Sequence, residues 1–178
     1  MKIFDEVPYI RSDGLILRRI CREDRDRLAE MTGDDMVYRY LPTFLFEKRY
    51  ADTELVIERM YDECFAQHES VLLGIEPRGE GFCGIAEIYG VDDRIHKVSI
   101  GYRLLRRYWG RGIASEAVAA LVNFIYTDTD TQIITASTMV ENRASARVLG
   151  KNGFIMTASA VGEDWGYENL TAADKWFR

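Results

Sequence analysis

Residues 107–112 read Arg-Tyr-Trp-Gly-Arg-Gly, and residues 113–125 follow as Ile-Ala-Ser-Glu-Ala-Val-Ala-Ala-Leu-Val-Asn-Phe-Ile. The second stretch carries apolar side chains on one side of a helical projection, at Ile113, Ala117, Leu121, Phe124 and Ile125. That spacing predicts an amphipathic helix. The first backbone N–H groups of a helix lack intrahelical partners, and the helix dipole places partial positive charge there. A loop directly before such a helix is therefore a candidate anion site.

The loop itself has two features suited to phosphates. Gly110 and Gly112 remove side chains where a phosphate would approach the backbone. Arg107 and Arg111 add full positive charges at the rim, so the four residues together predict a pyrophosphate cradle. A second interpretation stays open, in which the two glycines serve only the backbone shape of the loop.

Two common nucleotide-binding motifs do not fit this loop. A P-loop requires glycine followed by lysine and then serine or threonine, whereas Ile113 and Ala114 follow Gly112. A dinucleotide-binding fingerprint requires a third glycine three residues further on, and Ser115 stands there. The sequence therefore predicts neither of these two nucleotide-binding motifs.

The rest of the chain alternates between helical and strand patterns. Periodicity and turn signals predict strands at 15–20, 71–75, 82–89, 97–105, 133–138, 154–158 and 167–176, and helices at 22–31, 36–38, 52–65, 113–125 and 141–151. The three middle strands are predicted to form an antiparallel meander, and residues 98–138 a strand–helix–strand crossover whose two strands lie parallel, with the helix on one face. The predicted fold class is α/β (α+β). It has one mixed, mostly antiparallel, twisted sheet of about six to seven strands, flanking helices and a central parallel pair.

Composition narrows the class of protein. The chain has 178 residues, is 47% hydrophobic and shows no linker or repeat, which predicts one domain over residues 1–178. A net charge of −6 with small basic clusters argues against nucleic acid as a partner. No apolar run approaches the ~20 residues of a membrane helix, and the acidic N-terminus does not resemble a signal peptide. Cys21, Cys64 and Cys83 form no metal-binding pair, so we expect reduced thiols and a cytoplasmic protein.

Two segments together resemble a known family. Arg107-x-x-Gly110-x-Gly112, followed by Ile113-Ala114, is similar to the coenzyme signature of the GNAT superfamily of N-acetyltransferases. The longer run from Gly101 to Ala117 looks like the branch of ribosomal-protein alanine acetyltransferases and their small-molecule relatives. Asn142-Arg143-Ala144-Ser145, continued by 151–154, resembles the second coenzyme helix of the family.

The resemblance implies acetyl-CoA as co-substrate, no metal, and direct attack by an amine through a tetrahedral intermediate. The acceptor would be a small-molecule amine or a protein N-terminus, and relatives are monomers or homodimers. The oxyanion donor would be a backbone N–H near Arg103–Leu104. The implied coenzyme-binding residues are Tyr102, Arg103, Leu104, Arg107, Gly110, Arg111, Gly112, Ile113, Ala114, Asn142 and Ser145.

The chain departs from the family pattern at two positions that bear on the catalytic groups. Many members place an acidic tyrosine seven residues after the helix asparagine, and this chain has Leu149 there. Ser145 is the nearest hydroxyl on the same helix, which makes it the candidate acid; a packing or capping serine is the alternative. Ser99 stands where relatives often carry a glutamate, so Glu87 is the candidate base. The alternative is that Glu87 is a strand residue exposed to solvent.

Two further assignments have competing interpretations. Asn142 can bridge backbone and pantetheine, or serve only as a helix N-cap. Acceptor specificity is expected from residues 30–66, whose aromatic side chains either line a pocket or pack in the core: Tyr38, Tyr40, Phe44, Phe46 and Tyr61. The alternative to an enzyme is a non-catalytic acyl-CoA-binding sensor, since the glycine loop suits both.

Overall fold

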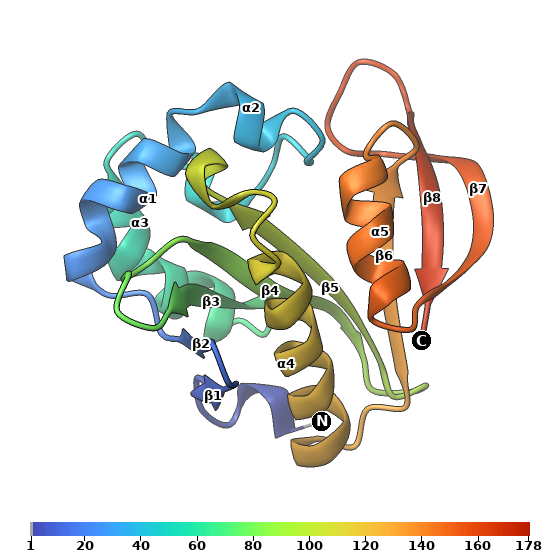
Figure 1. The fold of residues 1–178 in the computed structure, drawn as a ribbon, viewed down its shortest axis with the longest axis horizontal. Helices are drawn as coiled ribbons and strands as arrows, with labels where there is room; N and C mark the ends of the chain where they lie inside the picture. Colours follow the sequence, from blue (N-terminus) through green and yellow to red (C-terminus); the bar gives the residue numbers. More distant parts are fainter. Residues whose placement is uncertain (1) are drawn as a thin grey trace.

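The protein is described from a computed structural model, which covers residues 2–178. One eight-stranded sheet organises the chain, in the order β1-β2-β3-β4-β5-β6-β8-β7 (Figure 1). The strands are β1 Ile10–Arg11, β2 Leu15–Arg18, β3 Ser70–Pro77, β4 Gly84–Asp92, β5 Lys97–Leu104, β6 Ile133–Met139, β7 Ile155–Glu163 and β8 Thr171–Phe177.

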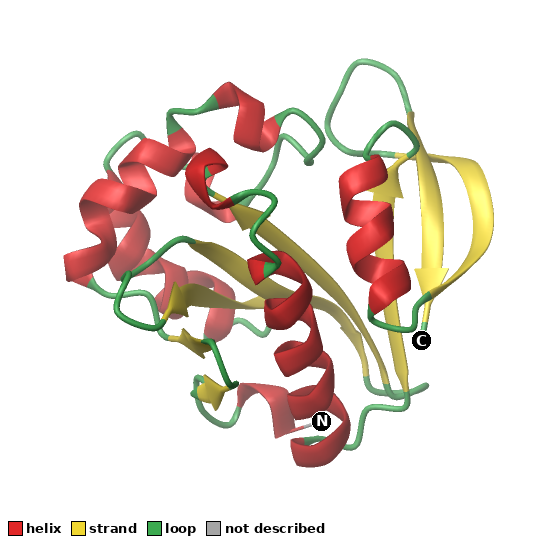
Figure 2. Cartoon of the chain, in the orientation of Figure 1, coloured by secondary structure: helices red, strands yellow, loops and turns green. Residues whose placement is uncertain are grey.

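Five α-helices accompany the sheet (Figure 2). They are α1 Arg25–Thr32, α2 Asp35–Tyr38, α3 Thr53–Arg59, α4 Ile113–Asp128 and α5 Arg143–Lys151. A π-helical segment, Met60–Phe65, continues directly from α3, and short 3-10 turns lie at Lys2–Phe4, Arg22–Asp24, Phe46–Lys48 and Arg106–Tyr108. The single helix predicted over 52–65 is therefore correct in extent but changes its hydrogen-bond pattern at Met60.

The predicted meander and crossover are both confirmed. Strands β3, β4 and β5 pair antiparallel in sequence order, and β5 pairs parallel with β6 after the α4 crossover. The sheet has eight strands rather than six to seven, because a two-residue strand at Ile10–Arg11 pairs with β2. So short a strand leaves no alternating pattern in the sequence from which to predict it.

The core lies where helices cover both faces of the meander. Strand β3 is buried along nearly its whole length, which requires cover on its two faces. Helix α4 crosses in front of the sheet in Figure 1 and buries one apolar stripe, which includes Ala117, Val118, Leu121 and Ile125. Helices α1 and α3 lie together beside the β3 side of the sheet (Figure 1).

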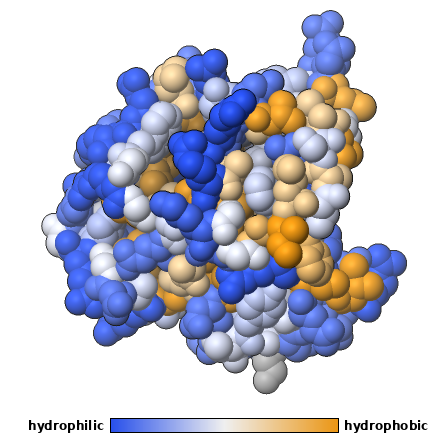
Figure 3. All heavy atoms as spheres, turned by 45° about the vertical axis from the view of Figure 1, so that its right-hand side comes forward, coloured by the Kyte–Doolittle hydropathy of each residue, from blue (hydrophilic) through white to orange (hydrophobic). Residues whose placement is uncertain are grey.

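The last two strands differ from the meander in their exposure. Strand β7 is the edge of the sheet, and all its residues but Glu163 are exposed. Apolar side chains interrupt the polar surface on the side that Figure 3 turns forward, and exposed ones on β7 include Ile155, Met156 and Val161. Register shifts interrupt its pairing with β8, a device that bends and twists edge strands.

Candidate active site

The cleft arises where two neighbouring strands part. Strands β5 and β6 pair only where Lys97–Ser99 of β5 lies beside Ile133–Thr135 of β6, although each strand continues beyond these residues. Past Ser99 the strands diverge, and a cavity of about 660 Å³ opens between them. Its walls come from β4, β5, β6, the starts of α4 and α5, and the segment between α2 and α3. The divergence leaves the β5 edge without a strand partner on this side, so its backbone groups face the cleft.

The glycine loop forms one end of this cleft. Gly110 and Gly112 have φ values of 73° and 82°, a left-handed region that strains other residues. Gly112 is the N-cap of α4 and gives the helix no side-chain cap. A Cβ atom at either glycine would meet no atom within 4 Å. Gly110 and Gly112, together with Ile113 and Ala114, therefore present the uncapped helix N-terminus to open space in the cleft.

The two arginines of the loop point elsewhere. Arg107 pairs with Glu30, and the Arg111 guanidinium donates to both carboxylate oxygens of Glu80 at 3.0 and 2.6 Å. Neither arginine lines the cleft. Each arginine pairs with a carboxylate from another segment of the chain, and the sequence of the loop does not indicate these partners. The structure thus supplies backbone groups for an anion, and it places the charged rim predicted from Arg107 and Arg111 outside the cavity.

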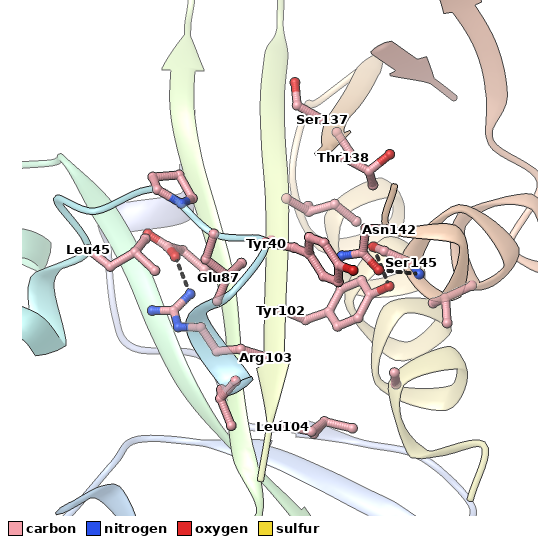
Figure 4. A pocket seen from close by; sticks show the side chains of 18 of the residues that line it. Tyr40, Leu45, Glu87, Tyr102, Arg103, Leu104, Ser137, Thr138, Asn142 and Ser145 are labelled. Carbon is pink, nitrogen blue, oxygen red and sulfur yellow. Dashed lines mark hydrogen bonds and ion pairs between the residues drawn. The ribbon is translucent and has the colours of Figure 1, made fainter. Parts of the chain in front are cut away.

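Helix α5 brings two predicted residues to the opposite wall. The side-chain oxygen of Asn142 accepts a hydrogen bond from the Ser145 backbone N–H at 3.1 Å, so Asn142 is the N-cap. The Ser145 Oγ lies 2.7 Å from the Tyr102 Oη, and Figure 4 shows the two side chains meeting between β5 and α5. Leu149 is buried at the cleft wall, so an aliphatic side chain replaces the tyrosine of many relatives.

Arg103, the next residue on β5, points to the other face of the sheet. Its guanidinium donates to Glu47 at 2.6 Å and to Glu87 at 2.6 Å, and its Nε lies 2.5 Å from Glu47. The Arg103 and Glu47 side chains are 3% and 0% exposed, and that of Glu87 is 13% exposed. We call Glu47, Arg103 and Glu87 the ion triad; with two carboxylates and one guanidinium, its net charge is −1.

The ion triad changes two sequence assignments. Burial alone would lower the pKa of Arg103, but the charges of Glu47 and Glu87 outweigh it and raise that pKa. Arg103 is thus a fixed cation whose side chain is occupied, which leaves only its backbone to contact a coenzyme. Glu87 points away from Ala86 and Ile88, as its alternation predicted, yet it is paired rather than solvated.

The far end of the cleft is covered by two loops held together. The Thr43 backbone N–H donates to the Trp165 carbonyl at 2.9 Å, and the Tyr167 hydroxyl donates to the Leu41 carbonyl at 2.8 Å. The aromatic set of residues 30–66 divides between the two predicted roles. Side chains that line the cleft here are Tyr40, Phe44 and Phe46, with Trp165 and Tyr89 from elsewhere. The Tyr38 hydroxyl donates to Glu47, and Tyr61 is buried, with a hydroxyl that accepts from the Ile20 N–H and donates to the Leu72 carbonyl.

A comparison with protein families decides the class. The model of the acetyltransferase (GNAT) domain matches residues 14–155, which include every predicted site residue. This chain belongs to the GNAT acetyltransferase family. It is accordingly an acyltransferase enzyme, and the GNAT fold is the architecture described above.

Curated GNAT relatives agree over most of the chain. An N-acetyltransferase of Bacillus licheniformis, p20, is 30% identical over 145 residues, covering 80% of each chain. The N-acetyltransferase YoaA of Bacillus subtilis is 25% identical over 168 residues, covering 94% of this chain and 93% of the relative. Neither relative carries an assigned acceptor, since both are called uncharacterized.

Solved GNAT structures share the fold at lower identity. A ribosomal L7/L12 α-N-protein acetyltransferase in complex with coenzyme A superposes with a TM-score of 0.80 at 17% identity, covering 96% of this chain and 97% of that one. Spermidine N-acetyltransferase from Vibrio cholerae, in complex with CoA and spermine, gives 0.77 at 16% identity, covering 94% and 96%. At this identity the likeness shows the fold alone, and it extends to GNAT proteins with protein and polyamine acceptors.

Sequence reasoning missed parts of this GNAT site. Glu47 completes the ion triad from a short 3-10 turn, and only the general expectation for residues 30–66 included it. The side chains of Glu163 and Trp165, from the end of β7 and the loop after it, also line the cleft. Within residues 2–178, no cluster of three His, Cys, Asp or Glu side chains could hold a metal ion. No helix in that range is long and apolar enough to cross a membrane.

Proposed function

We propose that this GNAT protein transfers an acetyl group from acetyl-CoA to a primary amine, by direct attack through a tetrahedral intermediate. The amine belongs to a protein N-terminus or a small molecule. One observation carries the proposal: the uncapped N-terminus of α4 opens into the cleft between the diverging strands β5 and β6. That geometry offers a pyrophosphate site at one end and a free strand edge beside it.

The coenzyme is assigned by the groups that face the cleft. Backbone N–H groups of residues 110–114 bind the pyrophosphate, which needs no side-chain charge. The pantetheine arm follows the β5 edge at Tyr102–Leu104, where it takes the place of a strand partner. Asn142 uses its amide oxygen for the helix cap, and its amide nitrogen is left to donate to the arm. Solved relatives in complex with coenzyme A support this choice of ligand.

Direct transfer is favoured over an acylated cysteine. Cys64 lines the cleft, but burial raises the pKa of its thiol to about 11. A thiol with that pKa is protonated at neutral pH and is a poor nucleophile, because the thiolate is the reactive form. The incoming amine must therefore attack the thioester itself.

Catalysis needs a proton acceptor for the amine and a proton donor for the leaving thiolate. We assign the first role to Glu87, a carboxylate at the cleft wall within the ion triad. Proton delivery to the sulfur is assigned to Ser145 and the group hydrogen-bonded to it. A backbone N–H near Arg103–Leu104 is the proposed oxyanion donor.

The acceptor end is mixed in character. Aromatic side chains line it, and the ion triad adds one net negative charge beneath them. A cationic amine is attracted by that charge before it loses its proton. The similarity to the branch that includes ribosomal-protein alanine acetyltransferases supports a protein N-terminus, and the spermidine acetyltransferase fold supports a small amine. We also propose that residues 1–178 act as one domain, cytoplasmic and monomeric or homodimeric, without nucleic acid or membrane partners.

The test measures thiol release from acetyl-CoA with a panel of amines, which contains spermidine, single amino acids and peptides with free N-termini. Products are identified by mass. We expect acetylated amine and coenzyme A in equal amounts, without a burst of thiol before acceptor is added. Calorimetry with coenzyme A provides the binding constant independently of turnover. Tight coenzyme binding with no turnover on any amine would instead make the protein an acyl-CoA sensor and end the proposal.

A further inference from the structure

The hydroxyl of Ser145 is not alone in the cleft. Its Oγ lies 2.7 Å from the Oη of Tyr102, close enough for a hydrogen bond in either direction. The two side chains come from different elements, β5 and α5, and they meet where the thioester would lie beside the diverging strands (Figure 4). Since a phenol is a much stronger acid than an alkyl hydroxyl, the two groups are not equivalent as proton donors.

The strand pairing of β5 and the hydrogen bond to Ser145 position Tyr102. It lies three residues beyond Ser99, the last residue of β5 that pairs with β6, so its side chain stands in the widening part of the cleft. The Ser145 backbone is itself fixed by the Asn142 cap. Burial raises the pKa of Tyr102 to about 12, and the hydrogen bond with Ser145 lowers it in part. The phenol therefore keeps its proton throughout the neutral range.

We propose that Tyr102 is the catalytic proton donor to the coenzyme A thiolate, and that Ser145 is a positioning residue that donates its own hydrogen to the Tyr102 oxygen. The assignment rests on the proposed acetyl transfer and sharpens its acid. The Ser145 hydrogen bond directs the Tyr102 proton away from α5 and into the cleft, and it stabilises the phenolate that forms on transfer.

The proton balance closes within the proposed reaction. The amine nitrogen, freed of its proton by the base, bonds to the thioester carbon and forms the tetrahedral oxyanion. Collapse restores the carbonyl and breaks the carbon–sulfur bond, and the electron pair stays on sulfur. The Tyr102 hydroxyl then gives its proton to the sulfur and becomes a phenolate. The base passes the first proton to solvent before the attack and then takes the excess proton of the amide nitrogen, and solvent returns a proton to the Tyr102 phenolate after the thiol leaves.

Charged groups elsewhere in the cleft do not take over this role. Arg103 on β5 and Glu87 on β4 point to the opposite face of the sheet, where they pair with each other. Arg147 and Lys151 on α5 also line the cleft, but neither side chain takes part in the Tyr102–Ser145 hydrogen bond. Tyr40, from the segment after α2, also lines the cleft, but no hydrogen bond of the described residues ties its hydroxyl to Ser145.

The first experiment compares Tyr102→Phe, Ser145→Ala and the double variant, with Tyr126→Phe on the outer part of α4 as control. Each enzyme is assayed for kcat and for calorimetric affinity toward coenzyme A. We expect Tyr102→Phe to lower kcat by about 10²-fold, a typical effect of losing general acid catalysis. Ser145→Ala should cost about tenfold, and the double variant should match Tyr102→Phe because the residues act as one unit. Coenzyme A affinity should stay within about threefold in all of them.

The second experiment separates catalysis from packing. A fluorinated tyrosine at position 102 keeps the hydroxyl and the ring but makes the phenol more acidic. The kcat profile should then gain an alkaline loss at lower pH than in the parent enzyme, whose phenol stays protonated to about pH 12. A purely structural hydroxyl would not move this profile, because the fluorinated ring fills the same space.

The outcomes distinguish this proposal from the one beneath it. Absence of turnover by the parent enzyme with any amine contradicts the acetyl transfer itself. Turnover by the parent together with an unchanged kcat for Tyr102→Phe, or with an unmoved profile for the fluorinated enzyme, leaves the transfer standing and overturns the role of Tyr102. A double variant much slower than Tyr102→Phe would make Ser145 an independent donor.

Discussion

The two faces of strand β5 do different work with neighbouring residues. Tyr102 faces α5 and meets one neutral partner, the hydroxyl of Ser145. Arg103 faces the segment between α2 and α3 and meets two carboxylates, Glu47 and Glu87. Alternation along a strand separates their side chains although their backbones are joined. One strand therefore contributes to a neutral hydroxyl pair on one face and to a charged cluster on the other, on either side of the proposed thioester position.

We expect the Arg103 face of β5 to contribute mainly to stability and the Tyr102 face mainly to catalysis. The neutral pair of Tyr102 and Ser145 loses only one hydrogen bond when either hydroxyl is removed. A buried charge cluster holds three segments together, and removing one member leaves buried polar groups without their hydrogen-bond partners. Variants on the Arg103 face should therefore affect folding first, and variants on the Tyr102 face should affect turnover first.

The largest effect is expected from Glu47→Ala. Glu47 is fully buried and accepts from Arg103 and from the Tyr38 hydroxyl. Its removal leaves the guanidinium with Glu87 alone, a change that typically costs about 3–5 kcal/mol of unfolding free energy. In a chain of this length the melting temperature should fall by roughly 6–20 °C, measurable by calorimetry.

Glu63→Ala is the matched control, because its carboxylate pairs with Arg59 one helical turn away near the surface. Its melting temperature should change little, since exposed pairs are screened by solvent. Equal losses for the two variants would contradict the special status of the buried cluster and would leave the two faces of β5 energetically alike.

Glu87→Gln should have the next largest effect, this time on the rate. Glutamine keeps an oxygen for Arg103 but cannot accept the proton of the amine. We expect kcat/KM at neutral pH to fall about 10²-fold and the loss of activity toward acid pH to disappear from the profile. Glu76→Gln, a β3 carboxylate paired with Arg18, is the control and should retain the parent profile. An unshifted profile for Glu87→Gln would remove Glu87 as the base.

Much of the fold was predictable from local patterns. The apolar residues of Gly84–Tyr89 and Lys97–Leu104 have the pattern of strands, and the apolar stripe from Ile113 encodes α4. The parallel pairing of β5 with β6 follows from the crossover rule. Local patterns do not contain the length of that pairing, which ends at Ser99 of β5 and Thr135 of β6.

The sequence predicts the part of the candidate site that is formed by backbone groups, but not the part that is formed by pairs of side chains. Gly110 and Gly112 have positive φ values, which glycine adopts more readily than other residues, so their identity indicates this conformation. Partners of charged side chains are set by distant segments instead, so the sequence does not show that Arg103 meets Glu47 or that Tyr102 meets Ser145. Those pairs join residues 56 and 43 positions apart.

A smaller effect is expected at the coenzyme end, from Gly112→Ala. The left-handed φ of 82° strains alanine by roughly 1–2 kcal/mol. The new Cβ also projects into the open space before the α4 N-terminus, so coenzyme A affinity should fall about tenfold. Gly79→Ala shares the strain, with φ of 75° and open space around it, but lies in the β3–β4 turn. The control should lose the same stability and keep the parent dissociation constant for coenzyme A. Similar affinities for the two variants would contradict the binding of the coenzyme phosphates by the loop.

The smallest effect is expected from Arg111→Ala, although the sequence alone gives this arginine the role of a phosphate ligand. In the structure its guanidinium is about half exposed, donates to Glu80 and does not line the cleft. The pair lowers the pKa of Glu80, so the small stability it adds is present above the ordinary carboxylate pKa and is lost as pH falls through the lowered value. We expect coenzyme A affinity within about twofold of the parent at low and physiological salt, measured by calorimetry. A tenfold loss at low salt that fades as salt rises would show that Arg111 leaves Glu80 for the phosphates, and the coenzyme end would then use side-chain charge as the acceptor end does.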